Sequence, residues 1–470
     1  MRRMIEKSVA HPRRLAYVCA LAVAALMSVF LIEIPIQLSD SFTEFTNLQG
    51  RTWWEMVSAE FYNGAYFRPL KRGMIKIVYD LSAGHYQLAF RGFHAMQLVV
   101  LLILAVRMLR IRDRAGLVAL PLALAILVGI HTFSDSVVEA FPVNHFLTIL
   151  ICCAAAVNLA QARPRLLVDV AAVALLVFAM LTLESGLIVW VVFAAAWAVG
   201  ERGVSRRGLI ALTACLGAYF IGRFILIGGS VPGLDERSTG FGFAVLGPDE
   251  LVRRFGANPL PFYIYNVICG LSTVLFAEPR GGVWAFVREV SSGLPEPWQI
   301  VNVFTSTATT VIIARYALTR AAAWRAGTFT DADRFVVMFL VVLPANAVFA
   351  AAYEKDVIMS PAGLFYAAAA FMVVREMPAF RVAPTLIMLV AIGWTIRYVG
   401  IHDHLRARAF DVRDEWAYYD DWAREQRTDV TLTGAQSAIK QRLLDEAVLR
   451  RPLAPRVSFG SFDRLIDMTQ

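Results

Sequence analysis

The residues RLAYVCALAVAALMSVFLIEIPI (14–36) form an apolar run that is long enough to cross a membrane. A helix needs about 20 consecutive, mostly apolar residues to cross the hydrocarbon core of a bilayer. The basic residues before the run resemble the start of a signal peptide, but the run is long enough to span and lacks a small-residue cleavage site. The sequence therefore predicts an uncleaved first spanning helix.

The composition extends this prediction to the whole chain. Of its 470 residues, 58% are hydrophobic and only 17% are charged, and the mean hydropathy is +0.58. These values predict an all-α polytopic membrane protein. The formal net charge of +8 is expected to come from basic cytoplasmic loops, so nucleic acid is not an expected partner, whereas membrane lipids are.

All five cysteines lie in apolar runs, and none has the CxxC spacing of a metal site. They are Cys19, Cys152, Cys153, Cys215 and Cys269. Neither a disulfide framework nor a zinc site is therefore expected. No metal-ligating residues and no cofactor are predicted, and the sequence leaves open whether the protein needs a divalent metal.

Apolar runs of spanning length recur along the chain, and we expect eleven spans in all. They are residues 14–36, 88–109, 115–131, 145–162, 166–183, 185–200, 207–227, 298–318, 335–352, 359–376 and 382–401. A further apolar stretch at 260–278 is expected to lie in a re-entrant or surface helix within residues 260–297. Residues 1–401 would then form one transmembrane domain, followed by a polar tail at 402–470.

Lysine and arginine residues concentrate before the first span and in alternate short turns, which are therefore expected to be cytoplasmic. This places the amino terminus inside and the carboxyl-terminal tail outside. It also leaves one large outer loop, residues 37–87, which is expected to contain interfacial helices with tryptophan and basic residues.

That outer loop contains AYFRPLKRG (65–73), which places Arg68, Lys71 and Arg72 on the side where basic residues are normally sparse. One explanation is that these side chains reach lipid headgroups from an interfacial helix. The other is that they bind an anionic substrate. The sequence by itself leaves both explanations open.

Three successive outer turns also carry carboxylates at the ends of apolar spans, where charge is costly and often functional. The first turn has Asp40 and Glu44, the second has His131 and Glu139, and the third has Glu184. Each acid alone could be a turn or helix-end residue. Acids and cations on one membrane face match sugar transfer from a polyprenyl phosphate, which needs a base for the acceptor hydroxyl and cations for the phosphate.

Five stretches in the same order resemble the transmembrane O-mannosyltransferases that carry TPR repeats and their bacterial relatives, which have the GT-C glycosyltransferase fold. The stretches are AYFRPLKRGMIKIVYDLSAGHYQLAFRGFHAMQLVVLL (65–102), IHTFSDSVVEAFPVN (130–144), LESG (183–186), GRFILIGGSVPG (222–233) and AAYEKDVIMSPAG (351–363). The resemblance implies a GT-C-like bundle of about eleven helices in a bacterial inner membrane.

Together these patterns predict an inverting transfer from a polyprenyl-phosphate sugar donor to a lipid, glycan or protein acceptor on the outer face. Asp40 is the expected general base. Glu139 is expected to orient the acceptor or to share the role of base, and Glu44 is a further candidate. The residues expected to bind the substrate are Arg68, Lys71, Arg72, His131, Glu184, Arg223 and Lys355.

The chain departs from the family in two respects. Where the family usually has paired acids, this sequence has Ser-Asp-Ser around Asp40, and the TPR repeats are absent. Two alternatives therefore stay open, a catalytically inactive relative and a transporter or flippase of lipid-linked glycans. A transporter is expected to place polar residues deep in several spans along a path, whereas the apolar runs here are expected to be free of charge, with the charged residues gathered on one membrane face.

Overall fold

The computed structural model describes the chain from residue 12 to residue 448 with several gaps. The described residues are 12–36, 38–62, 66–130, 133–134, 137, 143–229, 233–235, 239–242, 244–277, 287, 289–293, 295, 297–352, 356–377, 384–418 and 432–448, and the side chains of 38–40, 245, 356, 408, 447 and 448 are not among them.

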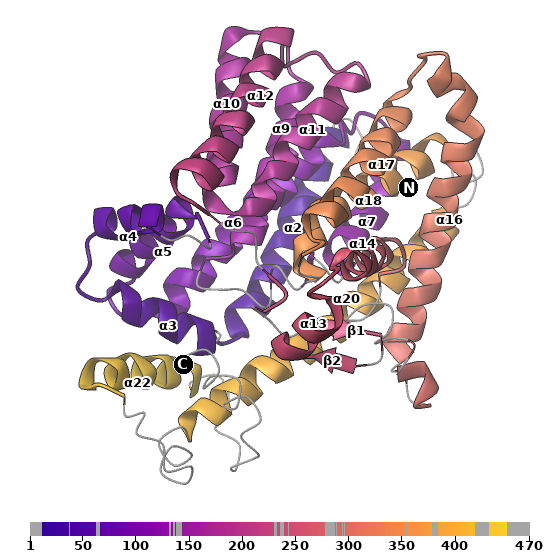
Figure 1. Cartoon of the computed structure of the whole chain (residues 1–470). Coiled ribbons are helices and arrows are strands. Elements are labelled where there is room, and N and C mark those ends of the chain that lie inside the picture. Colours follow the sequence, from indigo (N-terminus) through magenta and orange to yellow (C-terminus); the bar gives the residue numbers. More distant parts are fainter. Residues whose placement is uncertain are drawn as a thin grey trace.

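A bundle of roughly parallel and antiparallel helices forms the core of the molecule (Figure 1). Among the described residues, six helices are long and apolar enough to cross a membrane. They are α2 (Pro12–Glu33), α6 (Tyr86–Met108), α12 with its continuation η3 (Arg206–Leu226), α17 (Asp331–Phe349), η4 with α18 (Val357–Glu376) and α20 (Pro384–Ala417). This confirms the predicted class, a helical membrane protein.

The expected number of eleven spans is not established, because the other apolar helices are shorter. They are α7 (Arg114–Gly129), α9 (His145–Ala160), α10 (Leu166–Thr182), α11 (Ile188–Ala198) with η2 (Glu184–Leu187), and α14 (Leu260–Leu275). At 1.5 Å per residue, a helix of 16 residues covers about 24 Å, less than the roughly 30 Å of a bilayer core. Helix α16 (Pro297–Arg325) is long enough, but hydroxyl side chains between Thr305 and Thr310 interrupt its apolar stretch.

Ion pairs join several chain turns at one end of the bundle, which we call the basic end. Glu201, after α11, lies 3.6 Å from Arg110 and 3.3 Å from Arg334. Arg375, in the last turn of α18, lies 3.0 Å from Asp113. The basic turns that the sequence assigned to one side thus lie together, while the side of the membrane that they face stays a prediction.

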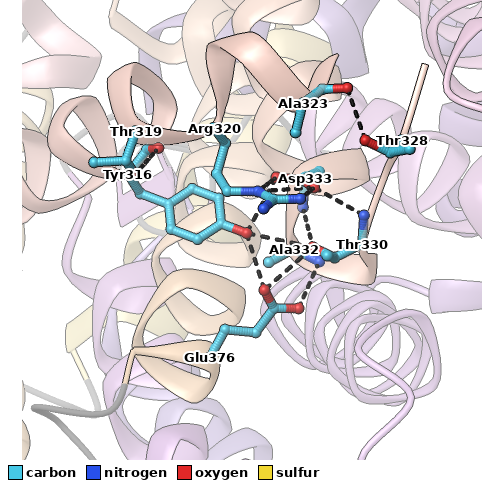
Figure 2. Close-up of polar contacts among 9 residues, drawn as sticks. All are labelled: Tyr316, Thr319, Arg320, Ala323, Thr328, Thr330, Ala332, Asp333 and Glu376. Carbon is cyan, nitrogen blue, oxygen red and sulfur yellow. Dashed lines mark hydrogen bonds and ion pairs between the residues drawn. The ribbon is translucent and has the colours of Figure 1, made fainter. Parts of the chain in front are cut away.

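The turn between α16 and α17 is fixed at this basic end by a saturated polar network (Figure 2). Asp333 is fully buried, accepts hydrogen bonds from Arg320 Nε and NH2 at 3.0 and 2.8 Å, and completes a capping box with Thr330. Glu376 of α18 accepts from the Tyr316 hydroxyl at 2.9 Å and from Thr330 Oγ1 at 3.1 Å. These two carboxylates, on α17 and α18, accept from donors on α16 and at the start of α17. Because the network joins all three helices in this way, we assign it a structural role.

The opposite end of the bundle, the loop end, carries the short elements. They are α3 (Leu38–Leu48), α4 (Trp53–Ala59), η1 (Glu60–Tyr62), α5 (Pro69–Ser82), the antiparallel strands β1 (Thr239–Phe241) and β2 (Ala244–Leu246), α13 (Pro248–Phe255) and α22 (Gly434–Val448). Figure 1 shows α3, α4 and α5 beside the ends of the long helices, with α22 against α3. Their placement at a membrane interface stays a prediction.

Helix α14 lies across the long helices and is seen nearly end-on in Figure 1. The carbonyl groups of Leu275, Phe276 and Ala277, at and just after its last residue, accept hydrogen bonds from Thr310 and Ser306 of α16 and, at 3.2 Å, from Arg397 NH2 of α20. The expectation of apolar runs free of charge is therefore wrong. Arg397 and Arg91 of α6 are both buried. Arg91 Nε and NH2 donate to the carbonyls of Ile34 and Pro35, and Arg397 NH2 donates to that of Ala277.

Candidate functional site

The stretch that begins α5 determines where three basic side chains lie. Pro69 is the first residue of the helix, so Arg68 occupies the position before it and Lys71 and Arg72 fall in its first turn. Cations are unfavourable at the positive end of a helix, and these side chains are compensated by acids from other elements. Gly73 permits close packing of α4 on α5, since a Cβ there would lie 2.8 Å from Trp53 Nε1.

Two arginines from distant parts of the chain contact one carboxylate. Arg68 Nε and NH2 lie 2.7 and 2.6 Å from Glu184 Oε2. Arg223 NH1 lies 3.4 Å from the other oxygen, Oε1. Arg68 also packs its guanidinium 4.5 Å from the centre of the Tyr66 ring, and Arg223 NH1 donates to the Tyr219 hydroxyl at 3.1 Å.

The local sequence explains why Glu184 and Arg223 can meet. Glu184 begins the short turn η2 directly after α10, and Gly186 lets this turn pack on that helix because a Cβ there would overlap the Ala179 carbonyl. Arg223 lies in η3 (Ile221–Leu226), a π-helical continuation of α12. Its neighbours Ile225 and Leu226 are exposed, whereas Arg223 is buried and directed at Glu184. Single π-helical turns of this kind occur often at functional sites.

The remaining basic residues of α5 converge on two further acids. Arg72 pairs with Glu44 of α3, and its Nε donates to Glu60 at 3.1 Å. Lys71 Nζ lies 3.7 Å from Glu44. The Arg68 backbone N–H donates to Glu60 at 3.1 Å and so connects both groups. We call this set the loop-end ion cluster, which consists of Glu44, Glu60, Arg68, Lys71, Arg72, Glu184 and Arg223.

Lys71 is the most strongly perturbed base of the cluster. Burial lowers the pKa of Lys71 to about 8, against the opposing attraction of Glu44, and Arg68 and Arg72 lower it further. Among its described side chains, the cluster has four basic groups and three carboxylates. Basic groups gathered at one end of the bundle can attract an anionic ligand.

Polar side chains of α6 hold the chain turn that leads into α3, and the sequence analysis did not assign them to the site. Gln87 Nε2 donates to the Ile34 carbonyl at 2.7 Å, and Arg91 NH2 donates to the Pro35 carbonyl at 2.9 Å. His94 Nε2 accepts from the Asn144 backbone N–H at 3.1 Å. Their spacing of four and three residues along an apolar helix was the signal in the sequence.

The structure brings together Glu44, Arg68, Lys71, Arg72, Glu184 and Arg223 of the sequence-predicted site, and it adds Glu60. Asp40 lies in α3, four residues before Glu44, but its side chain is outside the described residues. His131, Glu139 and Lys355 also lie outside them. Whether Asp40 and Glu139 share a cavity with Arg68 therefore stays a prediction.

The part of the chain that the structure describes contains no group of three or more His, Cys, Asp or Glu residues that could hold a metal ion. Comparisons with models of protein families, with curated proteins and with solved structures found no match. The fold and the site together define a helical membrane protein with a partly exposed, mixed-charge cluster at one end of its bundle.

Proposed function

We propose that this protein is a GT-C-type glycosyltransferase that moves a sugar from a polyprenyl-phosphate donor to an acceptor on the outer face of a bacterial inner membrane. Its bundle would have about eleven spans, the shorter helices crossing with their ends shielded by neighbours. One observation carries the proposal: Arg68 and Arg223, from distant segments, are directed at a single anion position that is partly exposed to solvent.

The roles follow from the chemistry of the transfer. Arg68 and Arg223 would bind the donor phosphate, since guanidinium groups match its oxygens in fixed, forked geometry. Asp40 would accept the proton of the acceptor hydroxyl as the sugar inverts. Positions 40 and 44 are one turn apart on α3, and Glu44 is held by Arg72 and Lys71, so the cluster fixes the helix that carries the base.

Three residues outside the described part of the chain are proposed to have the roles that the sequence predicts for them. Glu139 would orient the acceptor, and His131 and Lys355 would contribute contacts to the substrate. The acceptor would be a lipid, a glycan or a protein.

Exposed aromatic side chains near the cluster suit a lipid-linked donor. Trp54, Phe61 and Tyr62 are exposed on α4 and η1, directly before α5 in the chain. Tryptophan and tyrosine favour the headgroup region of a bilayer. Such an anchor would hold Arg68 at the depth of a lipid phosphate, with the polyprenyl chain in the adjoining hydrocarbon.

The proposal is tested by assaying purified, reconstituted protein for sugar transfer from polyprenyl-phosphate sugars. Asp40→Asn should reduce turnover by about 10² or more, the scale of a lost general base. Arg68→Lys should also impair turnover because lysine keeps the charge but loses the forked contact. Arg112→Lys, an exposed change at the basic end, is the matched control. Normal turnover in the Asp40 and Arg68 variants would reject these roles.

A second candidate function is transport of lipid-linked glycans, and one observation favours it. The carboxyl-terminal end of α14 lies among polar groups of α16 and α20, including Arg397 and Ser306, and helix ends that lie among polar groups inside a membrane protein often line transport sites. Flipping of a fluorescent polyprenyl-phosphate sugar in vesicles, without sugar transfer, would support this alternative. Transfer without flipping would reject it.

A further inference from the structure

We infer that Glu184 is a built-in competitor for the anion site formed by Arg68 and Arg223: its carboxylate occupies the position of the donor phosphate until the donor displaces it. The inference rests on the proposed function, because it takes the two arginines as the phosphate-binding groups. It adds a regulatory role for Glu184, which would oppose rather than assist phosphate binding.

The contacts of Glu184 are those of a bound anion. Both nitrogens of the Arg68 fork that face it, Nε and NH2, lie within 2.7 Å of Oε2, and Arg223 NH1 approaches Oε1 at 3.4 Å. A phosphate group offers the same arrangement of acceptor oxygens to two guanidinium groups. The carboxylate thus fills the position at which these cations would bind a phosphate.

The two arginines have further contacts that do not depend on Glu184. The Arg68 guanidinium packs on the Tyr66 ring, and Arg223 donates to the Tyr219 hydroxyl. These contacts would keep both cations oriented after the carboxylate leaves. An anion site held in this way needs little rearrangement to accept a new ligand.

Exposure indicates how a donor would reach the site. The side chains of Arg68 and Glu184 are 21% and 24% exposed, whereas that of Arg223 is 5% exposed. An incoming phosphate would therefore meet Arg68 first and contact Arg223 only as Glu184 moves. The packing of Gly186 on α10 fixes the backbone beside Glu184, so displacement would occur by rotation of the Glu184 side chain.

The test measures binding of a short-chain polyprenyl phosphate to the full-length protein, with the uncharged polyprenol as reference ligand. Glu184→Gln keeps the size of the side chain and removes its charge. It should tighten binding of the phosphate about fivefold, the scale of one partly exposed ion pair, and should leave polyprenol binding unchanged.

Glu60→Gln is the matched control. It also removes one negative charge from the cluster, but Glu60 contacts the Arg68 backbone N–H and the Arg72 side chain, not the Arg68 guanidinium. Equal affinities for wild type and Glu184→Gln, weaker binding by Glu184→Gln, or an equal gain in Glu60→Gln would overturn the inference. If Glu184→Gln does not fold, Glu184→Asp serves instead, because its shorter side chain cannot reach both arginines; it too should bind the phosphate more tightly than wild type, and unchanged or weaker binding would overturn the inference.

The binding result is separable from the transfer assay. Tighter phosphate binding by the Glu184 variant in a protein that transfers no sugar would support the inference and reject the proposed enzyme. Sugar transfer by the wild type, with no gain in phosphate binding by the variant, would reject the inference and leave the enzyme proposal intact.

Discussion

At the scale of single residues, the loop-end ion cluster shows that long side chains can reach one carboxylate from helix positions that point in different directions. Neighbouring positions on a helix point about 100° apart, so Lys71 and Arg72 leave α5 in different directions. Both side chains nevertheless reach Glu44 of α3, because they are long enough to bend toward a shared carboxylate.

Lys71→Met should stabilise the protein near pH 7, and this gain should shrink between pH 8 and 10.5. Burial of the ammonium lowers the pKa of Lys71 from 10.5 to about 8. The folded wild type therefore releases this proton before the unfolded chain does, and its stability rises with pH through that window. Methionine has no proton to lose, and Glu44 keeps its partner Arg72.

Thermal unfolding in detergent at several pH values measures this difference. Lys71→Arg is the control, because a guanidinium stays charged up to pH 10.5 and should show no such rise. If the difference in unfolding temperature between wild type and Lys71→Met is the same at pH 7 and pH 10, the prediction is wrong.

Gly186→Ala should destabilise the protein by about 1–3 kcal/mol, the range for forced repacking in a tight site. The added Cβ would overlap the Ala179 carbonyl and push the turn that carries Glu184 away from α10. Gly217→Ala in α12 is the matched control. A Cβ at position 217 would meet no atom within 4 Å. Because alanine favours a helix more than glycine does, this change should stabilise the helix by about 1 kcal/mol. Chemical unfolding curves give the free energy of unfolding of each variant. Equal changes in this free energy for Gly186→Ala and Gly217→Ala would contradict the prediction that the tight contact at Gly186 makes the difference.

At the scale of elements, the helix that carries the proposed base is held from two sides. Polar side chains of α6 fix the turn before α3. On the other side, Leu443 of α22 is buried in an apolar cluster with Phe42 and Phe45 of α3, and the Phe42 ring lies 5.2 Å from that of Trp416 of α20. The carboxyl-terminal segment therefore contributes to the position of α3.

Leu443→Ala should loosen α3 without disturbing the basic end of the bundle. Truncation of a buried leucine lowers stability by about 2–5 kcal/mol. Here the loss should weaken the packing of α22 on α3. Hydrogen exchange followed by mass spectrometry should show faster exchange in α3 and unchanged exchange in α17. Gln441→Ala, at an exposed position of the same helix, should change neither. Unaltered exchange in α3 would show that α22 does not support it.

At the scale of the whole molecule, the bundle has two chemically distinct ends. Turns rich in arginine meet at the basic end, joined by ion pairs through Glu201 and Asp113. The loop end carries the mixed-charge cluster and the exposed aromatic residues of α4 and η1. The bias of basic loops toward the cytoplasm predicts that the loop end faces outward.

Cysteine labelling in intact cells tests this orientation. Asn47→Cys at the loop end and Arg163→Cys at the basic end introduce thiols at exposed positions, whereas the five native cysteines are buried or half-buried. A membrane-impermeant maleimide should label position 47 in intact cells and position 163 only after permeabilisation, with the wild type giving the background. The reverse pattern would invert the topology and place the cluster in the cytoplasm.

The sequence determined the helical membrane class, because apolar runs of spanning length dictate helices whatever they pack against. It also singled out most of the cluster, since a charge at the end of an apolar run is costly and must have a partner. The sequence did not determine the number of spans, because helices of 16 residues such as α7 are short for a bilayer and the hydroxyl-rich α16 is not apolar enough.

Only the tertiary structure decided which charges meet. Glu60 was not assigned to the site, and Arg397 and Arg91 were counted within apolar runs. All three are buried: Glu60 accepts from Arg72, Arg397 donates to the Ala277 carbonyl, and Arg91 donates to the Pro35 carbonyl. The pairing of Glu184 with both Arg68 and Arg223 depends on the packing of α10, α12 and the outer loop. Sequence spacing cannot specify such pairings, because the energy of an ion pair depends on distances between segments that only folding fixes.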